Sequence, residues 1–419
     1  MALTPFLFAI TACNQENEPG DTGVAVELPG ISHVGSVDRN ASPSTANLDQ
    51  LNAENAAFST TLLTELYTAA AGNLVTSPWS LQIVMAQVVA GADGDSKTAI
   101  NDTFGWTLAE ADFHEAFNAA DLTVAAHNDP AADEPVAITS TNQIFVTSGY
   151  ELGEPWLDTL SGNYGTGVRE MDFAGDPSGV AGDINAWIAD RTGDHIKDLV
   201  TQEMVADSRM LLANALFFKA SWAVPFTEES TSDLDFTLTT GDVVSVPTMR
   251  GTANLAGGFG DGFFVADIPF TDSGLTMTIV LPDEGTFDAF VSGMTWETMA
   301  DVFENEAFCE ECSLQMPKFE FKSQPPMNEA LSALGMGPAF GGSYPGINPN
   351  LTLTSIDQQG FIAVNENGAE AAAATVASFS DSYTEPPFGP VVVDHPFVWF
   401  IRETDGGAVL FAGIVVDPR

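Results

Sequence analysis

The stretch that decides the fold runs from residue 361 to residue 378 and reads FIAVNENGAEAAAATVAS. Its centre is almost all alanine, the best helix former, so propensity alone favours a helix. Gly368, however, is a poor start for a helix, and the β-branched Thr375 and Val376 are poor helix material. A polar, acidic and proline-containing piece, DSYTEPP, follows at residues 381–387.

A second interpretation is a segment with two allowed states, an exposed loop and a strand that enters between existing strands. Successive side chains of a strand face opposite sides, so every second residue shares a face. One face would carry only small or apolar residues: Ala369, Ala371, Ala373, Thr375, Ala377 and Phe379. The other face would carry Glu370, Ser378 and Ser380, which suit solvent. On the residues alone, the alanine-rich helix and the inserting strand both remain open.

The sequence on either side predicts helices first and strands later. Apolar residues recur at helical spacing in residues 48–71 and 80–90. Short strand-like runs dominate from residue 235 onward, and two buried runs, 391–401 and 408–416, close the chain. We find no internal repeat. Helices followed by antiparallel strands predict an α+β fold in one large domain.

Five further segments, taken with the stretch at 361–375, resemble the serpin family in content and order. They are NLVTSPWS at 73–80, NAW at 185–187 followed by Thr192-Gly193, LANALFFKASW at 212–222, VDHPF at 393–397 and LFAG at 410–413. Single pieces are weak evidence, but their order is specific. The resemblance covers about residues 48–419 and implies a single serpin domain with a large central mixed sheet, two smaller sheets, about eight to nine helices and an exposed reactive-centre loop.

The resemblance also implies roles for particular residues. The hinge, where the loop leaves the sheet, matches Glu366, Gly368, Ala369, Glu370, Ala371, Ala372, Ala373, Ala374 and Thr375. The shutter, where the central strands must part, matches Ser77, Ser80 and Asn214, with Gln358 at a position that is usually His. An amide also donates and accepts hydrogen bonds, so we expect the shutter to be kept. Trp222 matches the breach tryptophan beneath the point where the loop first enters the sheet.

In the family, the scissile bond usually lies sixteen residues beyond the hinge acid, which places it here at Ser382–Tyr383. The following stretch is slightly long, so Tyr383–Thr384 is the next candidate. Serine before the bond suggests an elastase- or subtilisin-like serine protease, and Tyr383 there would suggest a chymotrypsin-like one; a cysteine protease is a further partner. The loop has no basic residue, which argues against trypsin-like proteases.

The implied function is inhibition by suicide-substrate trapping. The protease cleaves the loop and forms its acyl-enzyme, and the loop inserts as a new strand that carries the protease along. The inhibitor would be a monomer that needs no catalytic residue, metal or cofactor. The alternative is a non-inhibitory serpin-fold binding or surface protein. Bulky or charged residues at inward hinge positions would favour that alternative, and the hinge has none.

The residues themselves exclude several classes of function. With 12 Lys and Arg against 58 Asp and Glu, the formal net charge is −46, so the surface repels nucleic acid and anionic lipid. No Gly-x-Ser-x-Gly elbow, phosphate-binding glycine loop or zincin motif is present. Cys309 and Cys312 form CEEC, which lacks the further ligands that zinc needs. We expect two free thiols or a local disulfide there.

The N-terminal residues suggest export. Residues 5–12 form a short apolar run, and Ile10–Cys13 resembles a bacterial lipobox, in which the cysteine carries the lipid. The run is too short to span a bilayer, and no Lys or Arg precedes it. We therefore expect a signal or lipobox-like segment at 1–13, a flexible acidic tether at 14–47 and the serpin domain at 48–419. The expected location is extracellular or at the cell surface, with Cys13 as the only link to a membrane.

Overall fold

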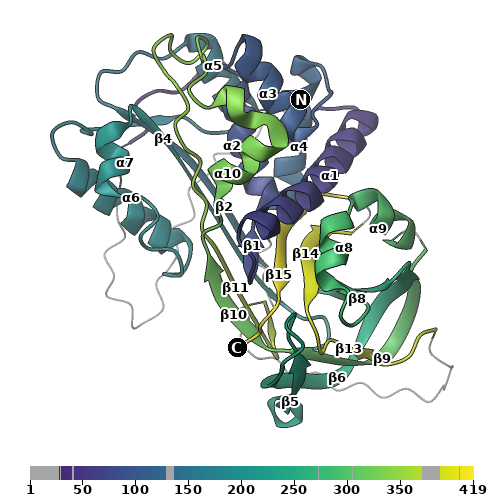
Figure 1. Ribbon diagram of the computed structural model, residues 1–419. Coiled ribbons are helices and arrows are strands. Elements are labelled where there is room, and N and C mark those ends of the chain that lie inside the picture. Colours follow the sequence, from purple (N-terminus) through teal and green to yellow (C-terminus); the bar gives the residue numbers. More distant parts are fainter. Residues whose placement is uncertain are drawn as a thin grey trace, which may run out of the picture.

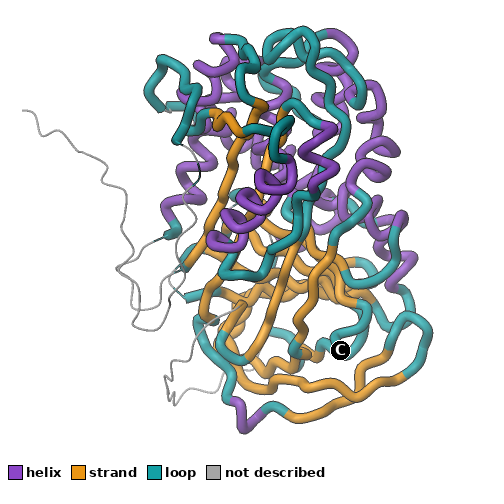
Figure 2. The backbone as a smooth tube through the Cα atoms, turned by 90° about the vertical axis from the view of Figure 1, so that its left-hand side faces the viewer, coloured by secondary structure: helices purple, strands orange, loops and turns teal. Residues whose placement is uncertain are grey.

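The computed structural model describes residues 28, 30–39, 42–128, 136–271, 273–303, 305–369, 387–404 and 406–419. Helices gather at one end of the molecule and most strands at the other (Figures 1 and 2). The helices are α1 (Thr45–Ala69), α2 (Pro78–Val89), α3 (Gly94–Phe104), α4 (Glu110–Ala126), α5 (Glu154–Thr159), α6 (Pro177–Arg191), α7 (Gln202–Asp207), α8 (Phe287–Gly293), α9 (Trp296–Phe303) and α10 (Met327–Leu331). The described residues contain no helix long and apolar enough to cross a membrane.

A six-stranded mixed sheet forms the centre of the molecule. Its order is β10 (Phe319–Ser323), β11 (Gly360–Asn365), β12 (Gly368–Ala369), β4 (Met210–Ser221), β2 (Ala137–Thr147) and β3 (Val168–Met171). Only β2 and β3 pair in parallel, and the other neighbours are antiparallel. The alanine-rich stretch therefore begins as a strand in this sheet, and residues 370–386 lie outside the described residues.

The remaining strands form two smaller sheets that share one long strand. Their order is β1 (Leu74–Thr76), β15 (Val409–Val415), β14 (Phe397–Glu403), β8 (Leu275–Pro282), β7 (Phe263–Pro269), β6 (Val243–Gly260), β9 (Ala307–Pro317) and β13 (Val391–Val392), with β5 (Ser232–Thr237) also on β6. The end of β6 pairs with β7, whereas its middle pairs with β9. Every residue of β14 and β15 is buried, which explains their continuous apolar sequence.

Two apolar cores lie on opposite faces of the six-stranded sheet. The larger core includes Ala220 and Ala369 and joins the sheet to the helices and to β14 and β15. The smaller core packs Ile184 and Trp187 of α6 against Ala213 of β4. Helix α6 thus covers the outer face of the sheet, and side chains that alternate along β4 enter one core or the other.

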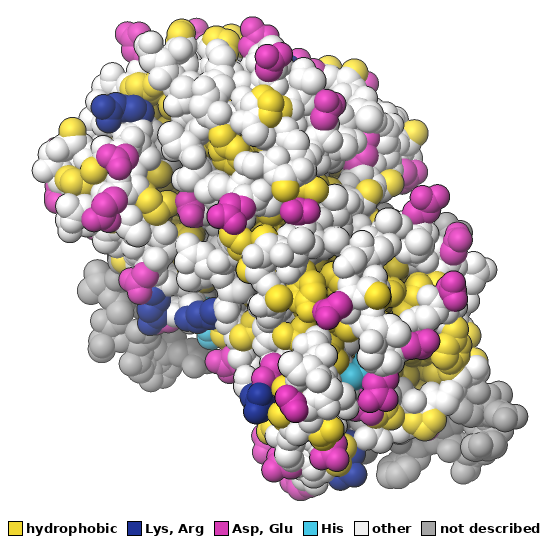
Figure 3. Space-filling model, in the orientation of Figure 1, with side chains coloured by type: hydrophobic (Ala, Val, Ile, Leu, Met, Phe, Trp, Pro, Cys, Tyr) yellow, Lys and Arg dark blue, Asp and Glu magenta, His cyan; other side chains and the backbone are white. Residues whose placement is uncertain are grey.

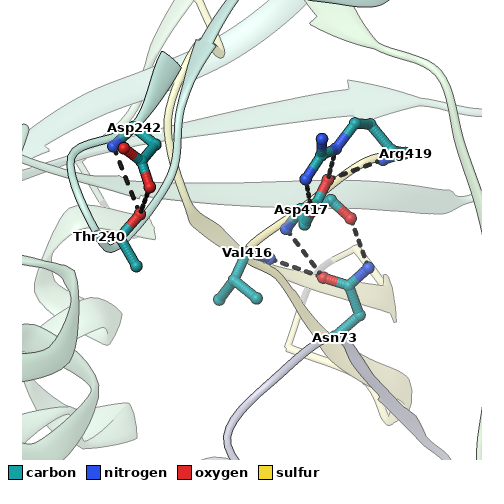
Figure 4. Close-up of polar contacts among 6 residues, drawn as sticks. All are labelled: Asn73, Thr240, Asp242, Val416, Asp417 and Arg419. Atoms are coloured by element: carbon teal, nitrogen blue, oxygen red, sulfur yellow. Dashed lines mark hydrogen bonds and ion pairs between the residues drawn. The ribbon is translucent and has the colours of Figure 1, made fainter. Parts of the chain in front are cut away.

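The C-terminal end of the chain is tied to this body. Asn73 accepts hydrogen bonds at its Oδ1 from the backbone of Val416 and Asp417, at 2.8 and 3.0 Å (Figure 4). Its amide nitrogen donates to the carbonyl of Asp417 at 2.5 Å. Arg419 pairs with Asp417 through its guanidinium at 2.6 Å. Asn73 therefore joins the connection between α1 and β1 to the residues that follow β15.

Part of the predicted tether is packed onto the body. Residues 32–33 lie against β3, where the backbone of His33 bridges to Val168. The chain then contacts α5 and α4, because Ser36 donates to Asp158 and Arg39 pairs with Asp121. Gly35 allows the contact with α5, since a Cβ there would lie 2.3 Å from the carbonyl oxygen of Leu157. Helix α1 begins at Thr45, where the Ser44 side chain accepts from the Asn47 backbone. The described part of the segment from 30 to 47 therefore differs from the flexible chain that its polar composition predicts.

Candidate hinge and strand-insertion site

The hinge begins inside the central sheet, between β4 and β11. Ala369 lies opposite Ala220 of β4 and opposite Val364 of β11, and the preceding Gly368 lies opposite Ser221 and Asn365. Residues 366 and 367 form the tight turn between β11 and β12. Gly368 and Ala369 therefore already form the start of a strand between β4 and β11.

Gly368 and Ala369 suit this position because there is no room for larger side chains. Gly368 has φ +154°, and a Cβ there would lie 2.1 Å from the carbonyl oxygen of Ala220. The Ala369 side chain is 1% exposed and points into the larger core. The glycine is needed for the close approach of two backbones, and the alanine fills a space that accepts only a small apolar group.

Glu366 anchors the start of the hinge. Its carboxylate pairs with the Lys318 ammonium at 2.8 Å and accepts from the Thr231 hydroxyl at 2.6 Å. Its backbone carbonyl accepts from the Phe226 amide at 2.8 Å. Burial opposes ionisation of this carboxyl, but the hydrogen bonds from Lys318 and Thr231 outweigh burial and hold the pKa of Glu366 below its ordinary value.

Trp222, for which the resemblance implies the breach position, lies against the turn between β11 and β12. Its side chain is 1% exposed and stacks on Phe270, with ring centroids 4.8 Å apart. The indole N–H donates to the carbonyl of Asn365 at 3.0 Å, and its backbone N–H donates to the carbonyl of Asn367 at 2.9 Å. One residue therefore fixes both sides of the turn that precedes Gly368.

Ser77 and Gln358 form a buried polar cluster under the sheet. The Gln358 side chain accepts from the Ser77 backbone N–H and donates to the Ser77 carbonyl, both at 3.0 Å. The Ser77 hydroxyl donates to the Leu410 carbonyl at 2.8 Å and accepts from the Ser80 backbone N–H, capping α2. The amide of Gln358 thus uses both its donor and its acceptor here.

Other predicted site residues lie in the sheet or outside the described residues. Asn214 lies in β4, in register with Asn142 of β2. The remaining hinge residues from Glu370 to Thr375, the proposed scissile bond at Ser382–Tyr383 and Cys13 lie outside the described residues.

An apolar cavity of about 100 Å³ lies beyond the shutter, beside the start of β4. It is lined by Met85 of α2, by Met210 and Leu212 of β4 and by the chain from Leu351 to Gln358. The cavity therefore lies in line with β12, at the opposite end of β4. An apolar side chain could enter it without leaving a buried polar group unpaired.

Three contributors to this site were missed by the sequence reasoning. Lys318 and Thr231 bind the hinge acid, and Thr76 donates to Gln358 at 2.5 Å. Lys318 is one of only 12 cations in a very acidic chain, and it immediately precedes a strand that pairs with β11. The small number of Lys and Arg residues could have drawn attention to Lys318. The strand pairing that brings Lys318 to Glu366 is visible only in the fold.

The cysteines and histidines have structural contacts. A disulfide joins Cys309 and Cys312 within β9, which selects one of the two alternatives left open by the sequence. His114 contacts the Tyr164 hydroxyl at 2.7 Å, and burial lowers the pKa of His114 to about 4. The part of the chain that the structure describes has no group of three or more His, Cys, Asp or Glu that could hold a metal ion.

Comparison with known proteins agrees with this geometry. The family model described as "Serpin (serine protease inhibitor)" matches residues 53–418. A serpin-like protein of Thermococcus kodakarensis is 30% identical over 363 residues, covering 85% of this chain and 84% of that protein. The leukocyte elastase inhibitor of Bos taurus is 28% identical over 387 residues, covering 88% and 100%. The native structure of the thermophilic serpin tengpin aligns with a TM-score of 0.79 at 21% identity, covering 91% and 97%.

Proposed function

The chain belongs to the serpin family, and from this premise we propose that it inhibits a serine protease by loop cleavage, strand insertion and trapping. Members of this family are typically protease inhibitors rather than enzymes. The observation that carries the proposal for this chain is β12. Gly368 and Ala369 of the hinge already pair with both β4 and β11, and as a strand the residues that follow would place small or apolar side chains on the inward face.

The two registers of β12 define where the rest of the loop would go. Thr375 is six residues beyond Ala369, and six residues back from Ala220 and Val364 are Asn214 and Gln358. The registers with β4 and with β11 therefore agree, and an inserted Thr375 would lie between Asn214 and Gln358, both assigned to the shutter.

The same register leads the far end of the loop to the cavity beside β4. Ala377 would lie opposite Leu212, and Phe379 would lie opposite Met210. Both β4 residues line the cavity. A phenylalanine on the inward face would bury a large apolar surface there, which favours the inserted state by roughly 1.5–3 kcal/mol. Insertion is therefore favoured at its start by fit and at its end by apolar burial.

In the proposed reaction, the protease nucleophile attacks the carbonyl carbon of Ser382. The peptide bond to Tyr383 breaks, and the new amino group leaves with a proton. The carbonyl of Ser382 stays joined to the protease as an ester or thioester. Residues 370–382 then extend β12 between β4 and β11 and move the attached protease across the molecule before water can hydrolyse the acyl bond.

The test is incubation with pancreatic elastase, subtilisin and chymotrypsin, followed by denaturing gel electrophoresis. The proposal predicts a band at the mass of the protease plus the inhibitor chain up to Ser382, and this band survives boiling with detergent. Protease inactivated at its catalytic serine is the matched control and should give no such band. Cleavage of the loop by all active proteases without a stable complex would favour the non-inhibitory alternative.

A further inference from the structure

His195 stands between two phenylalanines that belong to the strands on either side of β12. Its ring centroid is 4.2 Å from that of Phe361 in β11 and 6.0 Å from that of Phe217 in β4. The interplanar angles are 16° and 13°, so all three rings are nearly parallel. His195 follows α6, and it thus reaches the sheet from the face that α6 covers.

The stack connects the two strands that would flank an inserted strand. The centroid distances of 4.2 and 6.0 Å set an upper limit of about 10 Å on the separation of the Phe217 and Phe361 rings, and two strands with a third between them lie roughly 9.5 Å apart. A small cavity at the same level is lined by Phe217 and Phe361 on the outer face and by Phe218 and Ile362 on the inner face. Because the cavity is lined from both faces, it lies within the gap between the two strands.

We propose that His195 is a positioning residue that holds β4 and β11 one strand apart and so controls the rate of loop insertion. This inference rests on the proposed function and identifies what regulates that site. The imidazole acts as a spacer: it contacts both neighbouring strands and prevents them from closing against each other. Without it, the incoming strand must first separate β4 and β11, which slows insertion.

The register places Ala372 at this level. It is three residues beyond Ala369, and three residues back from Ala220 and Val364 are Phe217 and Phe361. An inserted Ala372 would face the side of the sheet opposite to Ala369, so its side chain would point toward the stack. A methyl group fits below the imidazole, whereas a longer side chain would compete with it for the space between the two phenylalanines.

The first experiment follows uptake of a synthetic peptide with the sequence of residues 369–381, AEAAAATVASFSD, by the full-length protein. Native mass spectrometry gives the rate. His195→Ala should take up the peptide about five- to tenfold more slowly, the scale of losing aromatic contacts, and His195→Phe should stay near the unmodified protein. Lys197→Ala, in the same loop, is the matched control, because Lys197 is 55% exposed and pairs only with Asp194 in the described contacts. Equal or faster uptake by His195→Ala would overturn the spacer role, as would slow uptake by His195→Phe.

A second experiment uses the loop itself. Ala372→Leu should lower the yield of protease complex in the presence of His195, and the double variant with His195→Ala should regain much of it, because leucine then occupies the vacated space. If the losses of complex yield in the two single variants simply add in the double variant, the claim that both side chains occupy the same space is wrong. Thermal unfolding of each variant confirms that it is folded. If the unmodified protein traps no protease but peptide uptake depends on His195, the proposed trapping is wrong and the spacer role of His195 is supported. If trapping occurs and uptake is the same in all variants, only the spacer role is wrong.

Discussion

Replacing Ala369 by arginine tests the insertion step. The Ala369 side chain is 1% exposed and lies in the larger core between β4 and β11. A guanidinium in that apolar core would lose its hydration. We take the effective cost as about 3 kcal/mol, at the low end of the penalty for burying one unpaired charge in a protein.

Because Ala369 is already in the sheet before cleavage, arginine would expel residue 369 from the sheet, and insertion would then have to return it to the core at that cost. At 1.36 kcal/mol per tenfold change in rate, insertion should slow on the order of a hundredfold. Hydrolysis of the acyl-enzyme then has time to finish. The Ala369→Arg variant should therefore be cleaved near Ser382 like the parent but release active protease.

The assay is the number of inhibitor molecules consumed for each protease molecule inhibited, together with complex yield on a denaturing gel. Ala369→Ser is the matched control, since it keeps the size of the side chain and adds no charge. It should behave almost as the parent. Equal complex yield from Ala369→Arg and the parent would refute the reasoning that links burial at this position to trapping.

Three further predictions concern charge and location. The depressed pKa of Glu366 contributes stability that is present above its unfolded pKa near 4.3 and is lost as the pH falls through its lower folded pKa. Urea unfolding should show that Glu366→Gln loses about 1–3 kcal/mol of unfolding free energy at pH 7 and less at pH 3. An equal loss at both pH values would count against this anchor. The net charge of −46 should make the melting temperature rise between 10 mM and 1 M salt, because counterions screen like charges; a flat or falling curve contradicts this. Acidic side chains spread over the visible face support that expectation (Figure 3). Cys13 should carry a lipid, so a tagged fatty acid should label the full-length protein in a bacterial host and should not label Cys13→Ser; equal labelling of both would disprove the anchor.

The sequence was most informative where one local rule decides the structure. The continuous apolar runs near the C-terminus predicted the buried strands β14 and β15, and the apolar spacing at 80–90 predicted most of α2, which begins at Pro78 with Ser77 as its cap. The family resemblance supplied the roles of Ser77, Gln358 and Trp222, and the structure places each of them beneath or beside the sheet.

Contacts that depend on distant pairing could not be predicted in the same way. Lys318 reaches Glu366 because β10 pairs with β11, and nothing in the residues near Lys318 specifies that neighbour. The helix propensity of the alanines was outweighed at Ala369 by pairing on both sides, which is a tertiary effect. The pairing of residues 32–33 with β3 was missed for a related reason, because a polar composition says nothing of a sheet edge that is free to receive another strand.

The most direct test of the central claim is the intact mass of the product formed with elastase or chymotrypsin, measured under denaturing conditions. Trapping at the acyl-enzyme stage predicts one species whose mass equals the protease plus the chain up to Ser382, less one water. It also predicts a separate fragment that begins at Tyr383 and ends at Arg419. If the only products are unmodified, active protease and a cleaved chain with no covalent adduct, the proposed trapping mechanism is wrong.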